Sequence, residues 1–122
     1  MNDRFKFRAW DNLAQKYLDD FYVDGETGLI MYSAAEDENN VVLEQCTGLK
    51  DKNGKLIYEG DIIELTRSRN YGWCEKGRRL EVQWNTFNCC GFGFGKIGNL
   101  TEKCASNCIV IGNIHANKEL LK

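Results

Sequence analysis

One stretch of the chain, residues 46–65, constrains the fold more than any other. It reads CTGLKDKNGKLIYEGDIIEL and holds two turn signals on either side of a short apolar segment. Asn53 and Gly54 both tolerate positive φ, which a two-residue type I′ turn requires, so residues 49–59 are predicted to form a β-hairpin. Gly60 marks a tight bend or bulge where the strand changes direction. Small barrels of the SH3 type turn such corners, so the pattern favours a barrel over a flat sheet.

Apolar and alternating segments predict further strands on both sides of this run. The chain has 122 residues, enough for one domain or for one domain with a small appendage. We therefore expect a mainly β protein with little helix, in which an N-terminal β meander (residues 1–45) precedes an SH3-like β-barrel (residues 46–122). The expected strands are 5–10, 18–23, 29–33, 41–43, 62–66, 80–84, 91–96 and 108–114, with a loop at 34–40 and a helical turn capped by Asn117 at 117–122. The expected core comprises Trp10, Leu49, Tyr58, Ile62, Ile63, Val82, Trp84, Val110, Ile111 and Ile114.

Five blocks of the sequence, in the same order, resemble the YopX family. They are residues 8–11 (RAWD), 45–55 (QCTGLKDKNGK), 57–63 (IYEGDII), 82–84 (VQW) and 110–114 (VIGNI). The resemblance runs nearly the whole length of the chain and implies a small phage or prophage protein with an SH3-like barrel in its C-terminal part. It implies no established activity and no catalytic residues. Two departures stand out: His115 follows where the family usually has a tyrosine and then Glu-Asn-Pro, and residues 89–108 lie outside the family pattern.

Hydrophobic run length and charge distribution indicate where the protein works and what it contacts. The longest apolar run is far short of the ~20 residues that cross a bilayer, and the N-terminus lacks the apolar centre of a signal peptide. We therefore expect no membrane partner and a location in the cytoplasm of the bacterial host. The net charge is -2, but residues 17–44 hold eight acidic residues and no lysine or arginine. Residues 67–79 hold five basic residues and one acid, so the two segments differ strongly in charge.

The basic segment is a candidate nucleic-acid surface. It combines cations that pair with phosphates and aromatic rings that stack on bases, as single-strand binding surfaces do. The alternative is a solvated connection between two strands whose Trp73 turns into the barrel. The residues in question are Arg67, Arg69, Tyr71, Trp73, Lys76, Arg78 and Arg79.

Six cysteines in a chain without a secretory signal are expected to be reduced thiols or metal ligands. Cys89, Cys104 and Cys108 supply thiolates for a structural zinc site, with Cys46 and Cys74 as further candidates. The spacing does not match paired Cys-x-x-Cys motifs, and adjacent Cys89 and Cys90 point to opposite faces of an extended strand. The alternative is that these thiols are small buried hydrophobic groups, which leaves the protein without a cofactor.

Other chemistry-bearing residues have simpler interpretations. Residues 91–96 (GFGFGK) lack the ending of a phosphate-binding loop and indicate a strand with Phe92 and Phe94 on one face. His115, the single histidine, is expected at the rim of an apolar strand. Glu59 and Asp61 could share a face only if the strand were regular at Gly60, and a turn accounts for Asp61.

No catalytic arrangement is visible in the sequence, and we expect a protein that is not an enzyme. The leading hypothesis is a phage accessory protein that binds a host or phage macromolecule, with another protein as the expected partner, because small barrels present edges and loops suited to recognition. A nucleic-acid-binding module is the second hypothesis and a small enzyme is the third. Exposed barrel edges also permit self-association.

Overall fold

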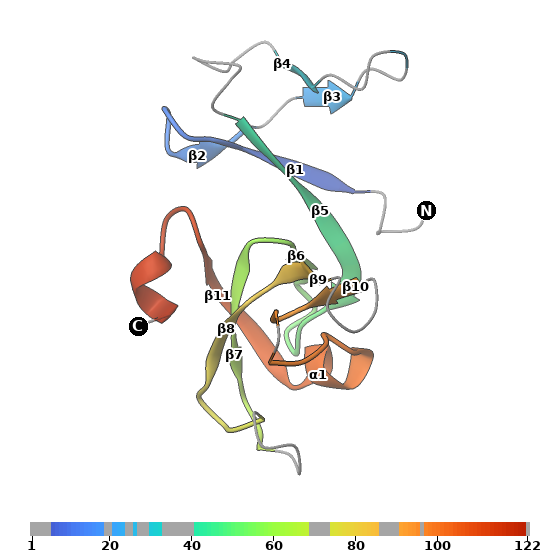
Figure 1. Ribbon diagram of the computed structural model, residues 1–122, viewed down its shortest axis with the longest axis vertical. Helices are drawn as coiled ribbons and strands as arrows, with labels where there is room; N and C mark the ends of the chain where they lie inside the picture. The colour runs from blue at the N-terminus through green and yellow to red at the C-terminus, as the bar shows by residue number, and fades with distance from the viewer. Residues whose placement is uncertain are drawn as a thin grey trace.

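The protein is mainly β, as predicted. The computed structural model describes residues 6–18, 21–23, 26, 30–32, 41–68, 74–85, 91–95 and 97–121. Strands make up most of the described chain, with one short α-helix and one 3-10 helix (Figure 1). The elements are β1 (Phe7–Asp11), β2 (Lys16–Tyr17), β3 (Phe21–Val23), β4 (Ile30–Tyr32), β5 (Val41–Lys50), β6 (Leu56–Tyr58), β7 (Asp61–Leu65), β8 (Arg79–Glu81), β9 (Gln83–Asn85), β10 (Gly91–Gly93), α1 (Glu102–Ser106), β11 (Cys108–Asn113) and η3 (Lys118–Leu121).

The ten-residue strand β5 connects the N-terminal strands to the rest of the protein. Its first half pairs antiparallel with β1, and its second half pairs with β6, so the sheet order is β2-β1-β5-β6. A second sheet has the order β11-β7-β8, and β10-β9 and β3-β4 form two-stranded pairs. In Figure 1, β5 runs from the level of β1 and β2 down to the strands of the C-terminal part. The predicted domain division after residue 45 falls within β5 and stays a prediction.

The predicted hairpin is present between β5 and β6, but the predicted type I′ turn is wrong. Gly54 has φ +82, whereas Asn53 is not in the left-handed region. The Asp51 carboxylate sets the turn, because its Oδ1 accepts hydrogen bonds from the amides of Asn53 and Lys55, each at 2.9 Å. A turn followed by a left-handed glycine is the usual geometry of a slightly longer hairpin loop. Asp51 Oδ2 also accepts from the amide of Val110 at 2.9 Å, which ties the hairpin to β11.

The predicted corner at Gly60 is confirmed. Gly60 has φ +89, and its amide donates to the carbonyl of Val82 at 2.8 Å while its own carbonyl accepts from Ile114 at 2.9 Å. A Cβ at this position would overlap the carboxylate of Glu44, with its Cδ only 2.8 Å away. Glycine is therefore required here for its conformation and for the space that it leaves.

A hydrophobic core lies among β6, β7, β8, β11 and α1. The expected core positions Trp10, Ile62, Ile63 and Val82 are buried, and Leu49 and Val110 pack against the core while remaining partly exposed. Tyr58, Ile111 and Ile114 are also only partly buried. The core also contains residues outside the predicted set, namely Ile57, Leu65, Leu80, Phe94, Leu100, Cys104, Ala105 and Cys108.

The prediction that Trp84 belongs to the core is wrong. Its side chain is 47% exposed, because the predicted strand 80–84 divides at Val82 into β8 and β9. β9 pairs with β10 instead of continuing the sheet of β7, so the indole lies outside the core against the ring of Phe92. The strand predicted at 91–96 is shortened to β10.

The C-terminal helical turn is present as η3, but Asn117 does not cap it in the predicted way. Its side-chain Oδ1 accepts from the amide of Asn113 at 3.3 Å, and its backbone carbonyl accepts from Leu120 at 2.9 Å. The helix α1 was not predicted; Thr101 caps it by accepting from the amide of Cys104. The loop predicted at 34–40 lies outside the described residues. Among the helices of the described chain, none is long and apolar enough to cross a membrane.

Candidate functional site

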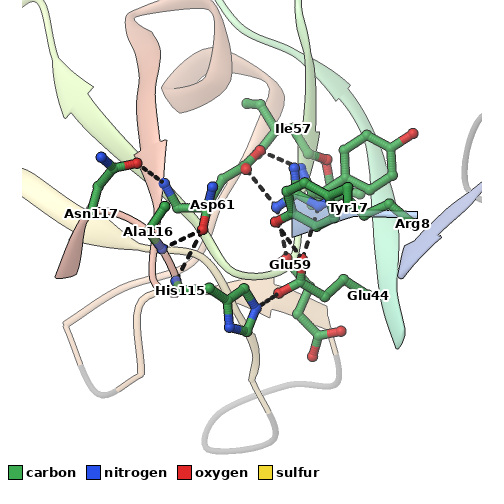
Figure 2. Close-up of polar contacts among 12 residues, drawn as sticks. Arg8, Tyr17, Glu44, Ile57, Glu59, Asp61, His115, Ala116 and Asn117 are labelled. Carbon is green, nitrogen blue, oxygen red and sulfur yellow. Dashed lines mark hydrogen bonds and ion pairs between the residues drawn. The ribbon is translucent and has the colours of Figure 1, made fainter. Parts of the chain in front are cut away.

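A cluster of charged groups joins strands from distant parts of the chain. Arg8 of β1 donates from Nε to Glu44 Oε1 at 2.9 Å and from Nη2 to Asp61 Oδ1 at 2.6 Å (Figure 2). Glu44 belongs to β5 and Asp61 opens β7, and both carboxylates are almost completely buried. One guanidinium therefore pairs with two buried carboxylates and links three strands.

The guanidinium of Arg8 is held between two aromatic rings. Its central carbon lies 4.4 Å from the ring centroid of Tyr17 and 4.7 Å from that of Tyr58, distances typical of cation–π contacts. Burial lowers the pKa of Arg8, but Asp61 and Glu44 outweigh it, so the net pKa is raised. The side chain therefore stays charged inside the fold.

Glu44 is the centre of the cluster. Its Oε1 also accepts from the Tyr17 hydroxyl, and its Oε2 accepts from Nε2 of His115, both at 2.9 Å (Figure 2). The imidazole of His115 stacks on Trp10 with the ring centroids 4.9 Å apart. Asn113 positions His115, because its side-chain oxygen accepts from the amide of His115 at 3.0 Å. Burial raises the pKa of Tyr17, so the phenol stays protonated and remains a donor to Glu44.

Asp61 completes the cluster from the corner at Gly60. Its Oδ2 accepts from the amide of Tyr58 at 2.8 Å. Burial raises the pKa of Asp61, and Arg8 and the Tyr58 amide offset part of that rise. Every carboxylate oxygen of Glu44 and Asp61 thus has a partner within the cluster. This arrangement is that of a structural tie, because its carboxylate oxygens already accept hydrogen bonds from groups of the cluster.

A groove of about 330 Å³ lies directly beside this cluster. It is lined by residues 42–44 of β5, 59–60 at the corner, 81–84 of β8 and β9, and residue 114. Two of its apolar side chains are open to solvent, Trp84 at 47% and Val42 at 38%. The lining includes three glutamates, Glu44, Glu59 and Glu81, and no lysine or arginine. The groove therefore combines exposed apolar surface with negative charge.

Glu81 is the carboxylate on the far wall of the groove from β5. Burial raises its pKa, Lys118 of η3 opposes that rise, and Glu44 adds to it. Glu44 is occupied by the cluster described above, so Glu59 and Glu81 are the two groove carboxylates that the cluster leaves available. The carboxylate of Glu59 has one long hydrogen bond, from the amide of Gln45 at 3.5 Å.

The residues predicted to bind nucleic acid are only partly described. Arg67 and Lys76 are exposed and Arg78 is half-buried, on the connection between β7 and β8. Arg79 pairs with Glu64 at 3.2 Å. A shallow depression of about 600 Å³ lies beside Arg78 and Arg79 and is also lined by Ile97, Leu120 and Leu121. Arg69, Tyr71 and Trp73 lie outside the described residues, and nucleic-acid binding by this surface stays a prediction.

Two of the three predicted zinc ligands belong to the core. Cys104 and Cys108 are buried, and the Cys108 thiol donates to the carbonyl of Ala105 at 3.3 Å. Burial, with Cys104 nearby, raises the pKa of Cys108 to about 12, which keeps the thiol protonated. Among the described residues, no three histidine, cysteine or acidic side chains are grouped so as to hold a metal ion. Cys89 lies outside the described residues, so the zinc prediction remains untested.

Sequence reasoning placed His115 at a partly exposed rim and Asp61 in a turn, and it did not connect them. Arg8 and Glu44 appeared only within family blocks or charge counts, and Tyr17 gave no signal. The cluster joins residues more than 100 positions apart, from Arg8 to His115. Glu59 and Asp61 do not share a face, in line with the bend expected at Gly60, because Asp61 turns inward to Arg8 and Tyr58 while Glu59 lines the groove.

Comparison with known proteins identifies the relatives of this fold. The sequence matches the family described as YopX protein over residues 6–122. The chain belongs to the YopX family. Among solved structures, it is similar to protein EF1440 from Enterococcus faecalis, with a TM-score of 0.63 and 28% sequence identity over 96% of this chain and 97% of that one.

A second solved structure, YopX from Bacillus subtilis, has the same fold. It matches with a TM-score of 0.55 and 22% identity over the full length of both chains. Comparison with curated proteins gives no match. The YopX family has no assigned activity in these comparisons, so the function of this member has to be argued from its own surface.

Proposed function

We propose that this YopX family member is a non-catalytic binding module of a phage or prophage, that it acts in the cytoplasm of the bacterial host, and that its partner is a protein. The observation that carries the proposal is the groove beside β5, where Trp84 and Val42 are exposed on either side of a hollow. Exposed aromatic side chains in a concave site are typical centres of protein recognition.

Two further observations support this proposal. The polar cluster has no unpaired carboxylate oxygen, so its geometry favours a structural role over acid–base chemistry. The four described cysteines, Cys46, Cys74, Cys104 and Cys108, are buried and form no disulfide, as suits a reducing compartment. The groove carries no positive charge along its lining, which disfavours a phosphate backbone as its occupant.

The test is affinity purification from phage-bearing host cells with the wild-type protein and two variants. Trp84→Ala removes the exposed indole of the groove, and Leu13→Ala removes an apolar side chain of similar exposure (52%) outside the groove. A specific protein partner should be retained by the wild type and by Leu13→Ala and lost with Trp84→Ala. Equal recovery by all three proteins would contradict the proposal, as would recovery of nucleic acid alone.

A further inference from the structure

We infer that the groove takes an extended, basic segment of the partner protein, which adds as a strand to the open edge of β5 and sets a lysine or arginine against Glu59 and Glu81. This inference rests on the proposed function, because it specifies what kind of protein segment the same groove binds. It draws on three features of the described residues: the backbone edge of β5, the charge of the groove and its exposed apolar walls.

The first half of β5 has one backbone edge without a neighbouring strand among the described residues. β1 pairs with residues 41–45, whereas β6 begins its pairing only at Cys46. The amide of Cys46 donates to the carbonyl of Lys6, so in the alternating antiparallel pattern Glu44 and Val42 exchange hydrogen bonds with β1. The amides and carbonyls of Val41 and Leu43 consequently point away from β1.

The corner at Gly60 turns the chain after β6 away from this edge, which no other described strand pairs with. The last backbone bond between β5 and the β6 arm runs from the amide of Glu59 to the carbonyl of Gln45 at 2.9 Å. At Gly60 the chain turns from β5 toward β8, where its amide bonds to Val82. The groove lies along the gap that this turn creates, between residues 42–44 and residues 81–84. An unpaired edge beside a groove is the geometry into which an extended peptide adds as a further strand.

Charge complementarity specifies the occupant. Glu59 and Glu81 are the groove carboxylates that Arg8, Tyr17 and His115 do not occupy. Lys118 of η3 offsets only part of the cost of burying the negative charge of Glu81, whose pKa stays raised, and a further cation placed beside it reduces that cost. A lysine or arginine of the partner supplies such a cation and forms charge-assisted hydrogen bonds to carboxylates.

The exposed walls specify the residues on either side of that cation. Trp84 packs edge-to-face on Phe92, with centroids 5.1 Å apart, and thus presents a supported ring rather than a free one. Val42 lines the β5 side of the same groove. Side chains alternate along an extended strand, so apolar residues flanking the basic residue at alternate positions fit this surface. Glutamates in the same lining oppose a nucleic-acid strand, whose phosphates they would repel.

The experiment is selection of random twelve-residue peptides displayed against the wild-type protein at low salt, followed by binding measurements on the selected peptides. We expect selected sequences with a lysine or arginine flanked by apolar residues. Glu59→Gln combined with Glu81→Gln should weaken their binding at least about tenfold, the effect of losing a charge-assisted hydrogen bond. Glu64→Gln removes a carboxylate outside the groove lining and should leave binding unchanged.

Two further measurements test strand addition directly. Hydrogen exchange at the amides of Val41 and Leu43 should slow in the complex, because these donors gain partners. N-methylation of alternate peptide amides should weaken binding strongly, while methylation of the amides between them should not. Loss of binding on methylation of every second amide is the result expected for a peptide strand that pairs along one edge.

The possible results separate the inference from the proposed function. Selected peptides that lack a basic residue, or whose binding ignores the two glutamine substitutions, overturn this inference and leave the binding role standing. Unchanged exchange at residues 41 and 43 overturns strand addition. A twelve-nucleotide oligothymidine that binds through Trp84 in place of peptides overturns both. Failure to select any peptide overturns the inference, and in that case the proposed function also fails if the Trp84-dependent partner is missing from cells.

Discussion

Replacing Gly60 by alanine should destabilise the protein more than replacing Gly54 or Gly77, two glycines of similar backbone conformation. With φ +89, an alanine at residue 60 costs about 1–2 kcal/mol of left-handed strain. Its Cβ would also overlap the Glu44 carboxylate, so Glu44 has to move. Moving it breaks at least one hydrogen bond among those from Arg8, Tyr17 and His115, each worth about 1.5–3 kcal/mol when a charged group takes part. The expected loss is therefore about 2.5–5 kcal/mol of unfolding free energy.

Two other glycines provide matched controls. Gly77 and Gly54 have φ values of +90 and +82, and a Cβ added at either position meets no atom within 4 Å. Gly77→Ala and Gly54→Ala should therefore cost only the strain of about 1–2 kcal/mol. Urea unfolding followed by tryptophan fluorescence gives the three free energies, provided that the slopes with urea agree. The difference between Gly60→Ala and the controls isolates the displacement of Glu44.

A double-mutant cycle then identifies the cause. In a Glu44→Ala background the overlap is gone, so adding Gly60→Ala should cost no more than Gly77→Ala does. Gly60→Ala that is no more destabilising than the two controls would refute the reasoning, because the close approach to Glu44 would then carry no energy. The same conclusion would follow if the two substitutions were simply additive.

Three other substitutions test the energetics of the fold. Arg8→Met should cost about 3–5 kcal/mol because it leaves two buried carboxylates without a cation, whereas Arg79→Met breaks a more exposed ion pair and should cost less than about 1 kcal/mol; urea unfolding of both variants checks the contrast. Asp51→Ala should cost about 1.5–3 kcal/mol for each charged hydrogen bond not replaced by water, and Asp51→Asn should cost less. The raised pKa of Cys108 means that its thiol ionises from pH 9.0 in the unfolded chain and near pH 12 in the fold. Stability should therefore fall more steeply above pH 9 in the wild type than in Cys108→Ala, and equal slopes would contradict the burial of this thiol.

Sequence reasoning succeeded where structure is local. The corner at Gly60 was predictable because a glycine between two strand-forming segments leaves few alternatives. The hairpin was placed correctly for the same reason. Its turn type was not, because the hydrogen bonds of the Asp51 side chain decide it and the Asn-Gly pair alone does not show them. Asp51 bonds to two amides of the loop and to Val110 of β11, and so favours a longer loop.

The errors arose where distant parts of the chain decide the outcome. Trp84 continues the alternation of its segment, yet β9 leaves the sheet at Val82 to pair with β10, and the indole becomes exposed. Helix α1 has five residues, too few to show a helical period in the sequence. The cluster around Glu44 requires β1, β5, β7 and the segment after β11 to converge, and no local pattern encodes that. The groove was missed for the same reason, since its walls come from four separated segments.

The cluster around Glu44 also orders events during synthesis. Arg8 leaves the ribosome before both of its carboxylate partners, Glu44 and Asp61. The contact between Glu44 and His115 can form only when residue 115 has emerged. Until then, Oε2 of Glu44 lacks its hydrogen-bond partner, the imidazole of His115. At translation rates of about 5–20 residues per second, that interval lasts seconds, long compared with hairpin formation. The fold is thus closed by the segment after β11. Ribosome-bound chains that carry a C-terminal linker long enough to place residue 115 outside the ribosome should resist protease, whereas chains cut before residue 115 on the same linker should remain sensitive.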